Sequence, residues 1–227
     1  LTGQPAGRFA KTMLETQQYP DLRLYPGGPP KPPYDITAHS LPIQMGVSTT
    51  QVEHPFEANL EPVDEIALPE GGVVGAGNVF ALDPRINASV RAVNLLLAAG
   101  GRVSRVATTD TDLALGTWVV DGLARETVEQ IARTTHVVAN ATSSADLNGS
   151  LANLAAPRIG LYRSWRPNGI DEGWTRFIFE HYDQRFETVR DRDLRQGGLA
   201  ERFDVILLPQ QPAREILEGN PISDYPP

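Results

Sequence analysis

Apolar positions follow a regular period only after about residue 70 of this chain. Beyond that point, short apolar runs alternate with stretches in which apolar residues stand three or four positions apart, which is typical of helices that bury one face. Val90, Val93 and Leu97 have this spacing, and Gly100 and Gly101 follow where the helix would end. The pattern therefore predicts alternating strands and helices in the second part of the chain.

The apolar runs and the helical stretches together predict an α/β fold. The predicted strands are 73–82, 102–107, 116–120, 136–139, 158–162, 186–189 and 203–208. The predicted helices are 9–18, 87–99, 124–134, 171–182 and 191–196. Strands separated by helices of about a dozen residues usually pair in parallel through right-handed crossovers. We therefore expect three-layer, mostly parallel sheets of the Rossmann-like or flavodoxin-like kind.

Frequent prolines set residues 1–70 apart from the rest of the chain. Proline lacks a backbone donor and disfavours helix in the residue before it, so we expect an extended arm whose tyrosines and leucines pack over another surface. An α/β domain is expected over 71–156 and the start of another over 157–227, with Pro157 at the boundary. A doubly wound domain has more strands than the three predicted after Pro157. Either the strands of 73–140 continue this sheet or the native protein continues past Pro227, and we favour the second.

Composition narrows the possible functions. The chain has 227 residues and no cysteine, which excludes disulfides, thiol nucleophiles and iron–sulfur clusters within it. Its net charge of −8 argues against nucleic-acid partners, because these require a basic face. No run of 18 apolar residues occurs, so we expect no membrane span, and no charged-then-apolar leader follows Leu1, so we expect no signal peptide in this chain.

One set of residues has metal-ligand character. His54 and Glu57 form a His-x-x-Glu pair, and His181 could supply a third ligand to a zinc ion with an open position for water. The alternative is that these are ordinary surface residues, which we favour. Pro55 interrupts the pair, and a histidine near a helix end is favoured by the helix dipole alone.

A polar loop after the predicted strand 158–162 is the best-placed candidate for ligand binding. Open α/β sheets bind ligands where a strand's carboxyl end meets the amino end of the next helix. There Arg163 and Arg166 could clamp a carboxylate, and Trp165 could stack on the ligand. Asp171 and Glu172, at the start of the next helix, complete the candidate set. The alternative is structural: Asp171 caps the helix, Glu172 stabilises its first turn, and Trp174 and Phe177 or Ile178 pack on the sheet.

Several segments of the chain resemble a known family. They are Arg-Ile-Gly-Leu-Tyr-Arg-Ser-Trp at 158–165, Asp-Glu-Gly-Trp-Thr-Arg-Phe at 171–177, Arg-Phe-Asp-Val-Ile-Leu-Leu-Pro at 202–209 and the Tyr-Pro-Gly-Gly-Pro-Pro block that starts at Tyr25. The chain resembles the carboxy-terminal region of large bacterial secreted zinc carboxypeptidases, in which a peptidase domain comes first and a class I glutamine-amidotransferase-like domain comes near the end. The resemblance implies that 157–227 is the first part of such an amidotransferase-like domain.

The resemblance also implies where activity lies. The family's zinc belongs to the amino-terminal peptidase domain, so we expect no cofactor and no catalytic residue in this chain, although the parent polypeptide would be a zinc-dependent hydrolase. The missing cysteine removes the glutaminase thiol, and Gln210 stands where an acidic residue is common in the family. The expected location is secreted or periplasmic.

Three functions follow from these observations. The first is a non-catalytic accessory portion, structural or substrate-presenting, whose partner is the peptidase domain of the same polypeptide or another copy. The second is a small-molecule-binding α/β domain that uses Arg163, Trp165 and Arg166. The third is a zinc-dependent peptidase in its own right, with zinc at His54, Glu57 and His181.

Overall fold

A computed structural model of the chain describes residues 4–15, 20–32, 41–109, 112–143, 147, 151–219 and 223. The chain divides into two compact units, Leu1–Glu65 and Ile66–Pro227. The first unit contains the helices α1 (Gly7–Leu14) and α2 (Leu41–Gln44). The helix predicted over 9–18 is therefore present up to Leu14, and 16–18 lie outside the described residues.

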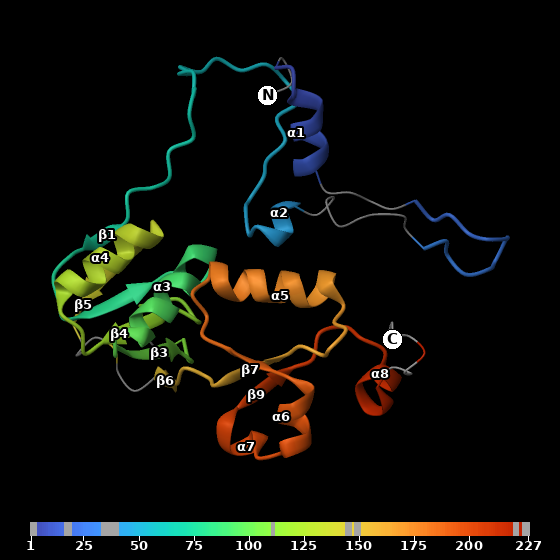
Figure 1. Ribbon diagram of the computed structural model, residues 1–227. Coiled ribbons are helices and arrows are strands. Elements are labelled where there is room, and N and C mark those ends of the chain that lie inside the picture. Colours follow the sequence, from blue (N-terminus) through green and yellow to red (C-terminus); the bar gives the residue numbers. More distant parts are fainter. Residues whose placement is uncertain are drawn as a thin grey trace. The chain divides into compact units, whose positions relative to one another are not determined.

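The second unit contains two sheets and their helices (Figure 1). Its strands are β1 (Gly72–Val74), β2 (Val79–Leu82), β3 (Arg102–Val106), β4 (Trp118–Asp121), β5 (Val138–Thr142), β6 (Leu151–Leu154), β7 (Ile159–Tyr162), β8 (Glu187–Val189) and β9 (Val205–Leu207). Its helices are α3 (Asn87–Ala98), α4 (Arg125–Thr135), α5 (Gly169–His181), α6 (Asp191–Gln196), α7 (Leu199–Arg202) and α8 (Ala213–Glu218). The predicted α/β class is confirmed.

The first sheet is mostly antiparallel, so the expectation of mostly parallel pairing is wrong for this part of the chain. Its strand order is β1-β5-β2-β4-β3-β6, and within it only β1 and β5 pair in parallel. From β2 to β5 the element order is βαββαβ, and β4 lies between β2 and β3. This is the split βαβ arrangement of ferredoxin-like folds. Helices do connect strands that run in the same direction, but an antiparallel strand is inserted between them.

The strand predicted over 73–82 is two strands, because the chain turns between β1 and β2. Gly75 and Gly77 have φ angles of 86° and 146°, which other residues rarely adopt. A Cβ at Gly77 would lie 2.1 Å from the carbonyl oxygen of Thr142 on β5. The glycine-rich sequence therefore makes a turn that passes close to the neighbouring strand.

The core of this sheet forms mainly on one face. Phe80, Leu82 and Val120 are buried there against Val93 and Leu96 of α3, together with side chains of α4. On the other face Val79 and Val119 pack with loop side chains, including Leu147. In the described residues, helices therefore cover one face of this sheet, giving two layers instead of the expected three.

The second sheet has the order β8-β7-β9 and is parallel throughout, as predicted. Arg176 of α5 donates to Thr188 Oγ1 at 3.2 Å, which places α5 on one face. The opposite face buries Tyr162 and Val189 against side chains of α6 and α7, including Leu194. Figure 1 shows α5 on the other side of β7 from α6 and α7. The strand order matches the first three strands of a flavodoxin-like sheet.

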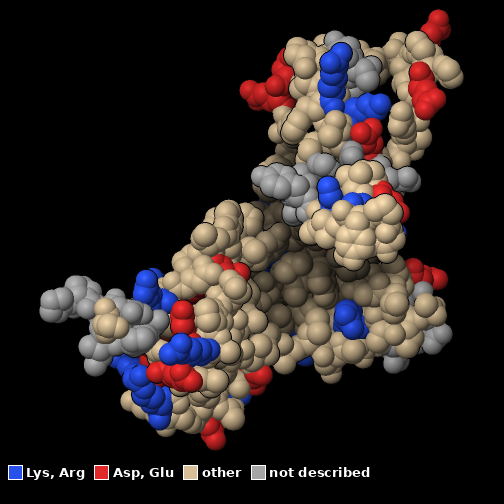
Figure 2. Space-filling view, turned by 90° about the vertical axis from the view of Figure 1, so that its right-hand side faces the viewer, with Lys and Arg blue, Asp and Glu red and all other residues tan. Residues whose placement is uncertain are grey.

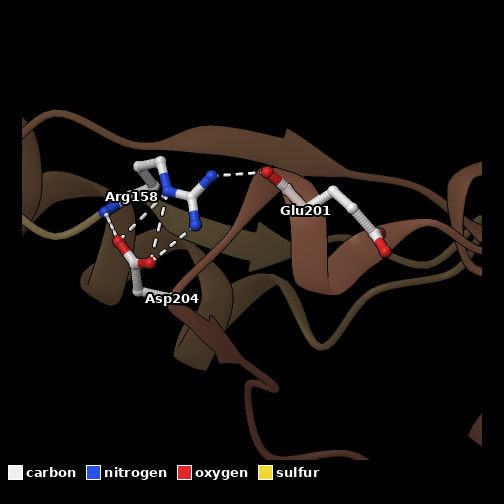
Figure 3. Close-up of polar contacts among 3 residues, drawn as sticks. All are labelled: Arg158, Glu201 and Asp204. Atoms are coloured by element: carbon white, nitrogen blue, oxygen red, sulfur yellow. Dashed lines mark hydrogen bonds and ion pairs between the residues drawn. The ribbon is translucent and has the colours of Figure 1, made fainter.

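An ion pair joins the starts of β7 and β9 (Figure 3). The Arg158 guanidinium donates to the Asp204 carboxylate at 2.7 Å, and the Arg158 backbone N–H donates to the same carboxylate at 2.8 Å. A further guanidinium nitrogen donates to the backbone carbonyl of Glu201. Because Arg158 stabilises the charged form through these hydrogen bonds, the pKa of Asp204 falls from 3.8 to about 2.

Candidate functional site

A cavity of about 660 Å³ lies at the carboxyl ends of β7 and β8. Its walls come from the loop after β7, from α6 and from α8. The lining residues are Tyr162, Ser164, Trp165, Asp191, Leu194, Arg195, Glu215, Ile216, Leu217, Glu218 and Gly219. The volume is typical of sites for small molecules.

The sheet topology explains why these residues meet. Parallel strands present their carboxyl ends at one edge of the sheet, and ligands of open α/β sheets bind in the crevice outside that edge. Ser164 and Trp165 follow β7. Asp191 begins α6 after β8, the strand that pairs with β7. Glu215 comes from α8, the helix after β9. Three successive connections thus contribute to one cavity.

Asp191 holds the loop after β7 in place. Its carboxylate accepts a hydrogen bond from the Tyr162 hydroxyl at 2.7 Å and another from the backbone N–H of Trp165 at 3.2 Å. Burial of Tyr162, and then its hydrogen bond to Asp191, raise the pKa of the Tyr162 phenol from 10.0 to about 12. Tyr162 is therefore a neutral hydrogen-bond donor at physiological pH.

Ser164 has a buried hydroxyl that lacks a partner. The residue is only 7% exposed, and its Oγ has no hydrogen-bond partner among the residues that the structure describes. A buried hydroxyl without a partner costs about 1–3 kcal/mol. Ser164 lines the cavity as a residue, but its hydroxyl oxygen is itself buried.

The charged groups of the cavity are mostly acidic. Asp191, Glu215 and Glu218 line it, and Arg195 is the basic residue among its described lining. Glu218 forms an ion pair with Arg214 at 3.0 Å, so its charge is already compensated. Glu215 accepts a hydrogen bond from the side-chain amide of Gln211 at 3.1 Å. This partner is neutral, and Glu215 lies in the first turn of α8, where the helix dipole favours a negative charge.

Of the loop residues expected to bind a ligand, Trp165 lines the cavity, with 79% of its surface exposed. Arg163 and Arg166 have exposed side chains that are absent from the described lining of the cavity. Their backbones are engaged instead: the N–H of Arg163 donates to the carbonyl of Val189 at 2.8 Å, and the carbonyl of Arg166 accepts from Gln211 at 3.5 Å. The structure therefore does not bring the two guanidinium groups together with Trp165 around this cavity.

Asp171 and Glu172 make structural contacts in α5. Asp171 accepts a hydrogen bond from the backbone N–H of Gln210, which fastens α5 to the segment after β9. Glu172 is buried and forms an ion pair with Arg176 one turn later. The cap of α5 is Asn168, whose side chain accepts from the N–H of Ile170 at 3.2 Å, so the expectation that Asp171 caps this helix is wrong.

Trp174, Phe177 and Ile178 of α5 are exposed, which differs from the expectation that they pack on the sheet. Trp174 and Phe177 are 63% and 54% exposed, and their ring centroids lie 5.6 Å apart in an edge-to-face arrangement. Phe177 also stacks on His181, with centroids 5.8 Å apart. These side chains form an exposed aromatic row along the helix.

The three zinc-ligand candidates belong to different units. His54 and Glu57 are exposed residues of the first unit, and His181 lies in the last turn of α5 in the second. Within the described parts of the chain, no group of three or more His, Asp or Glu residues could hold a metal ion. No observation of these residues favours a zinc peptidase over the other two candidate functions.

Sequence reasoning missed most of the residues that line the cavity. Its candidate loop follows β7, where the cavity lies, but its candidate residues leave out Tyr162, Ser164, Asp191 and Glu215. The available signal was Asp191, because an acidic residue directly after a parallel strand lies at the edge where ligands bind. Glu215 offered no such signal, because α8 was not predicted.

Comparisons with known proteins identify no relative. No family model matches the chain, no curated protein matches it, and no solved structure matches it. In the parts that the structure describes, no helix is long and apolar enough to cross a membrane. On the face shown in Figure 2, acidic and basic side chains are interspersed and do not gather by sign.

Proposed function

We propose that this chain is a non-catalytic accessory portion, structural or substrate-presenting, of a secreted or periplasmic bacterial zinc carboxypeptidase. The single observation that carries the proposal is the segment 47–70, which is the last part of the proline-rich segment 1–70. From here on, the arm means residues 47–70. It connects α2 to β1 without forming a helix or a strand, and it repeatedly exposes large apolar side chains. These residues are Val47, Val52, Phe56, Leu60, Val63, Ile66 and Leu68.

The exposure of the arm favours a docking role. Leu60 is 83% exposed and Ile66 is 93% exposed, although side chains of this size gain about 1.5–3 kcal/mol each when they are fully buried. A run of exposed apolar residues is typical of a surface that binds another protein. The expected partner is the peptidase domain of the same polypeptide or another copy, and zinc is expected only in that peptidase domain.

The second sheet adds support from its topology. Its order, β8-β7-β9, is the one expected at the start of the amidotransferase-like domain that the resemblance implies. The chain has no cysteine for a glutaminase thiol. An inherited domain without its nucleophile fits an accessory role.

Limited proteolysis tests the docking role. A peptidase domain from a zinc carboxypeptidase of the resembled family is mixed with this chain, and cleavage within the arm is followed by mass spectrometry. We expect rapid cleavage of the chain alone and at least about tenfold slower cleavage in the mixture, because docking removes the cleavable conformation. Leu60→Ser should abolish the protection, and Glu61→Gln, at the neighbouring exposed position, should retain it. Equal cleavage rates with and without the domain would refute the proposal.

A second candidate function is the binding of a small molecule by the α/β unit. The cavity beside Trp165 favours it, because a volume of about 660 Å³ is suited to a small ligand. The residues around this cavity replace the Arg163 and Arg166 clamp as the expected binding set. Saturable quenching of tryptophan fluorescence that is lost in Trp165→Phe would support this function, and unchanged quenching in that variant would count against it.

A further inference from the structure

We propose that the end of the arm, residues 60–70, binds in an extended conformation to a basic groove lined by aromatic side chains on another protein. This inference rests on the docking role proposed above and names the chemistry of the surface that the arm would contact. It commits to a partner other than a second copy of this chain.

Prolines exclude a long helix in this part of the chain. Pro55, Pro62 and Pro69 stand at intervals of seven residues, so only six residues lie between one proline and the next. Proline lacks a backbone donor and disfavours helix in the residue before it. The structure accordingly has neither helix nor strand in 47–70 (Figure 1). The arm is therefore suited to binding as an extended, polyproline II-like chain.

In a polyproline II conformation the segment 60–70 has one apolar row and one acidic row. This helix has about three residues per turn, so positions three apart share a face. The apolar row is Leu60, Val63, Ile66 and Pro69. The next row is Glu61, Asp64, Ala67 and Glu70. The third row is mixed and contains Pro62, Glu65 and Leu68. Apolar and acidic side chains would thus lie on separate faces.

Both rows are exposed in the structure. Val63 and Ile66 are 78% and 93% exposed, although burial of side chains of this size is favourable. The carbonyl oxygen of Pro69 contacts Nδ1 of His136 at 3.1 Å, which attaches the end of the segment to the chain just before β5. The segment is therefore fastened at its end, and its side chains are accessible to a partner.

The charge of the arm specifies a basic partner. Residues 47–70 contain six acidic residues and no Lys or Arg. Interfaces place surfaces of opposite charge together, and like charges suppress wrong partners. A second copy fits poorly, because the net charge of this chain is −8 and basic side chains do not gather on the face shown in Figure 2. Charge complementarity therefore favours a different protein.

The apolar row specifies aromatic side chains in the groove. Polyproline II segments bind in grooves lined by aromatic side chains, because their bound conformation is largely preformed and little entropy is lost. A groove with aromatic rings on its floor and Arg or Lys along one rim would contact both rows at once.

Isothermal titration calorimetry of the full chain with a peptidase domain from the resembled family tests the proposal. We expect saturable binding that weakens as salt is added, because salt screens the attraction. Val63→Asp combined with Asp64→Val keeps the composition and the net charge but places an acid in the apolar row. This exchange should raise the Kd at least about tenfold. The matched control, Val52→Glu combined with Glu53→Val, lies in the arm before 60–70 and should leave the Kd within about twofold.

Pro62→Ala tests the extended conformation. Val52, Phe56, Leu60 and Val63 also have the spacing of one face of an α-helix, which the prolines prevent. If the arm binds as an extended chain, loss of a proline that restricts the free chain should weaken binding about two- to fivefold. Binding that is not weakened would overturn the extended conformation.

Nuclear magnetic resonance of the complex tests the aromatic lining. The methyl signals of Val63 and Ile66 should move upfield, because aromatic rings shield groups that lie over their faces. Unchanged methyl signals in a saturated complex would overturn the aromatic groove.

The outcomes separate this proposal from the docking role. No binding in calorimetry and no protection in proteolysis would refute both. Binding that is insensitive to salt, or equal in the unaltered chain and in the Val63–Asp64 exchange, would overturn the basic, aromatic groove and retain docking. Concentration-dependent self-association of the chain alone, lost in the same exchange, would overturn the proposal in favour of a second copy.

Discussion

Replacing Arg176 with methionine should destabilise the α/β unit strongly, because it leaves a buried carboxylate without its countercharge. The side chain of Glu172 is 5% exposed, and that of Arg176 is 23% exposed. The Arg176 guanidinium also donates to Thr188 Oγ1 at 3.2 Å and lies 5.2 Å from the ring centroid of Phe186. One side chain therefore connects α5 both to β8 and to the chain just before it.

The size of the effect follows from the burial of the pair. Removing one partner of a buried ion pair costs about 3–5 kcal/mol, whereas replacing both partners with apolar residues is often neutral or stabilising. We expect Arg176→Met to lower the free energy of unfolding by about 3 kcal/mol, the lower end of this range, because Arg176 is partly exposed. The double variant Glu172→Met with Arg176→Met should recover most of this loss.

Urea unfolding followed by far-UV circular dichroism provides the assay, because unfolding removes the helices of this unit, α5 among them. If Arg176→Met does not fold, the double variant should still fold, which keeps the comparison informative. Arg214→Met removes the partner of an exposed pair on α8 and serves as the control, with an expected change below about 1 kcal/mol. A loss below 1 kcal/mol for Arg176→Met, or a double variant less stable than the single one, would refute a buried, structural Glu172.

Four other predictions concern stability. Asp204, whose pKa is about 2 in the folded chain and 3.8 in the unfolded reference, contributes stability that is present above about pH 4 and is lost as the pH falls through 2. Acid unfolding should show that Asp204→Asn lacks this pH-dependent contribution, and identical pH profiles would contradict it. Gly71→Ala should destabilise the chain by about 2 kcal/mol in urea, because the new Cβ would lie 2.0 Å from the carbonyl oxygen of Ala132. Gly173→Ala, within α5 and with no atom within 4 Å of the new Cβ, should instead stabilise it by about 0.5–1 kcal/mol. Ser164→Ala should raise the thermal stability of the ligand-free chain slightly, since it removes an unpartnered buried hydroxyl; a clear loss of stability would indicate that the hydroxyl has a partner.

Local patterns in the sequence predict most elements of the second unit. The helix expected over 87–99 is α3, Asn87–Ala98, and the strand expected over 102–107 is β3, Arg102–Val106. The apolar period and the terminal glycines carry this information because they depend on residues close in the chain. The same patterns placed the strands of the parallel sheet after Pro157.

Strand pairing in the first sheet could not be predicted in this way. The insertion of β4 between β2 and β3 depends on contacts between distant residues, such as Phe80 with Val120 and Val103 with Val120. A βαβ unit with adjacent strands and one with a strand inserted have the same local pattern. The alternation of predicted strands and helices is therefore the same for a parallel sheet and for a sheet in which an antiparallel strand lies between the two parallel ones.

Topology led to the loop that borders the cavity, but of the candidate residues only Trp165 is in the described lining. The rule that ligands bind at the carboxyl ends of parallel strands led to the loop after β7 and to Trp165. It did not show that the Arg163 and Arg166 side chains lie outside the cavity lining, or that Asp171 is bonded to the backbone of Gln210. Side-chain direction in a loop depends on tertiary contacts that no local pattern encodes.

Hydrogen exchange of the arm, residues 47–70, tests the docking proposal most directly. Backbone amides of this segment lie outside helices and strands, so we predict rapid exchange in the chain alone at low concentration. If the partner is the peptidase domain, adding that domain should slow the exchange by at least about tenfold. If the partner is another copy, raising the concentration of this chain should slow the exchange to the same extent. Rapid exchange under all three conditions would contradict a docking arm, and so would strong protection in the dilute chain alone.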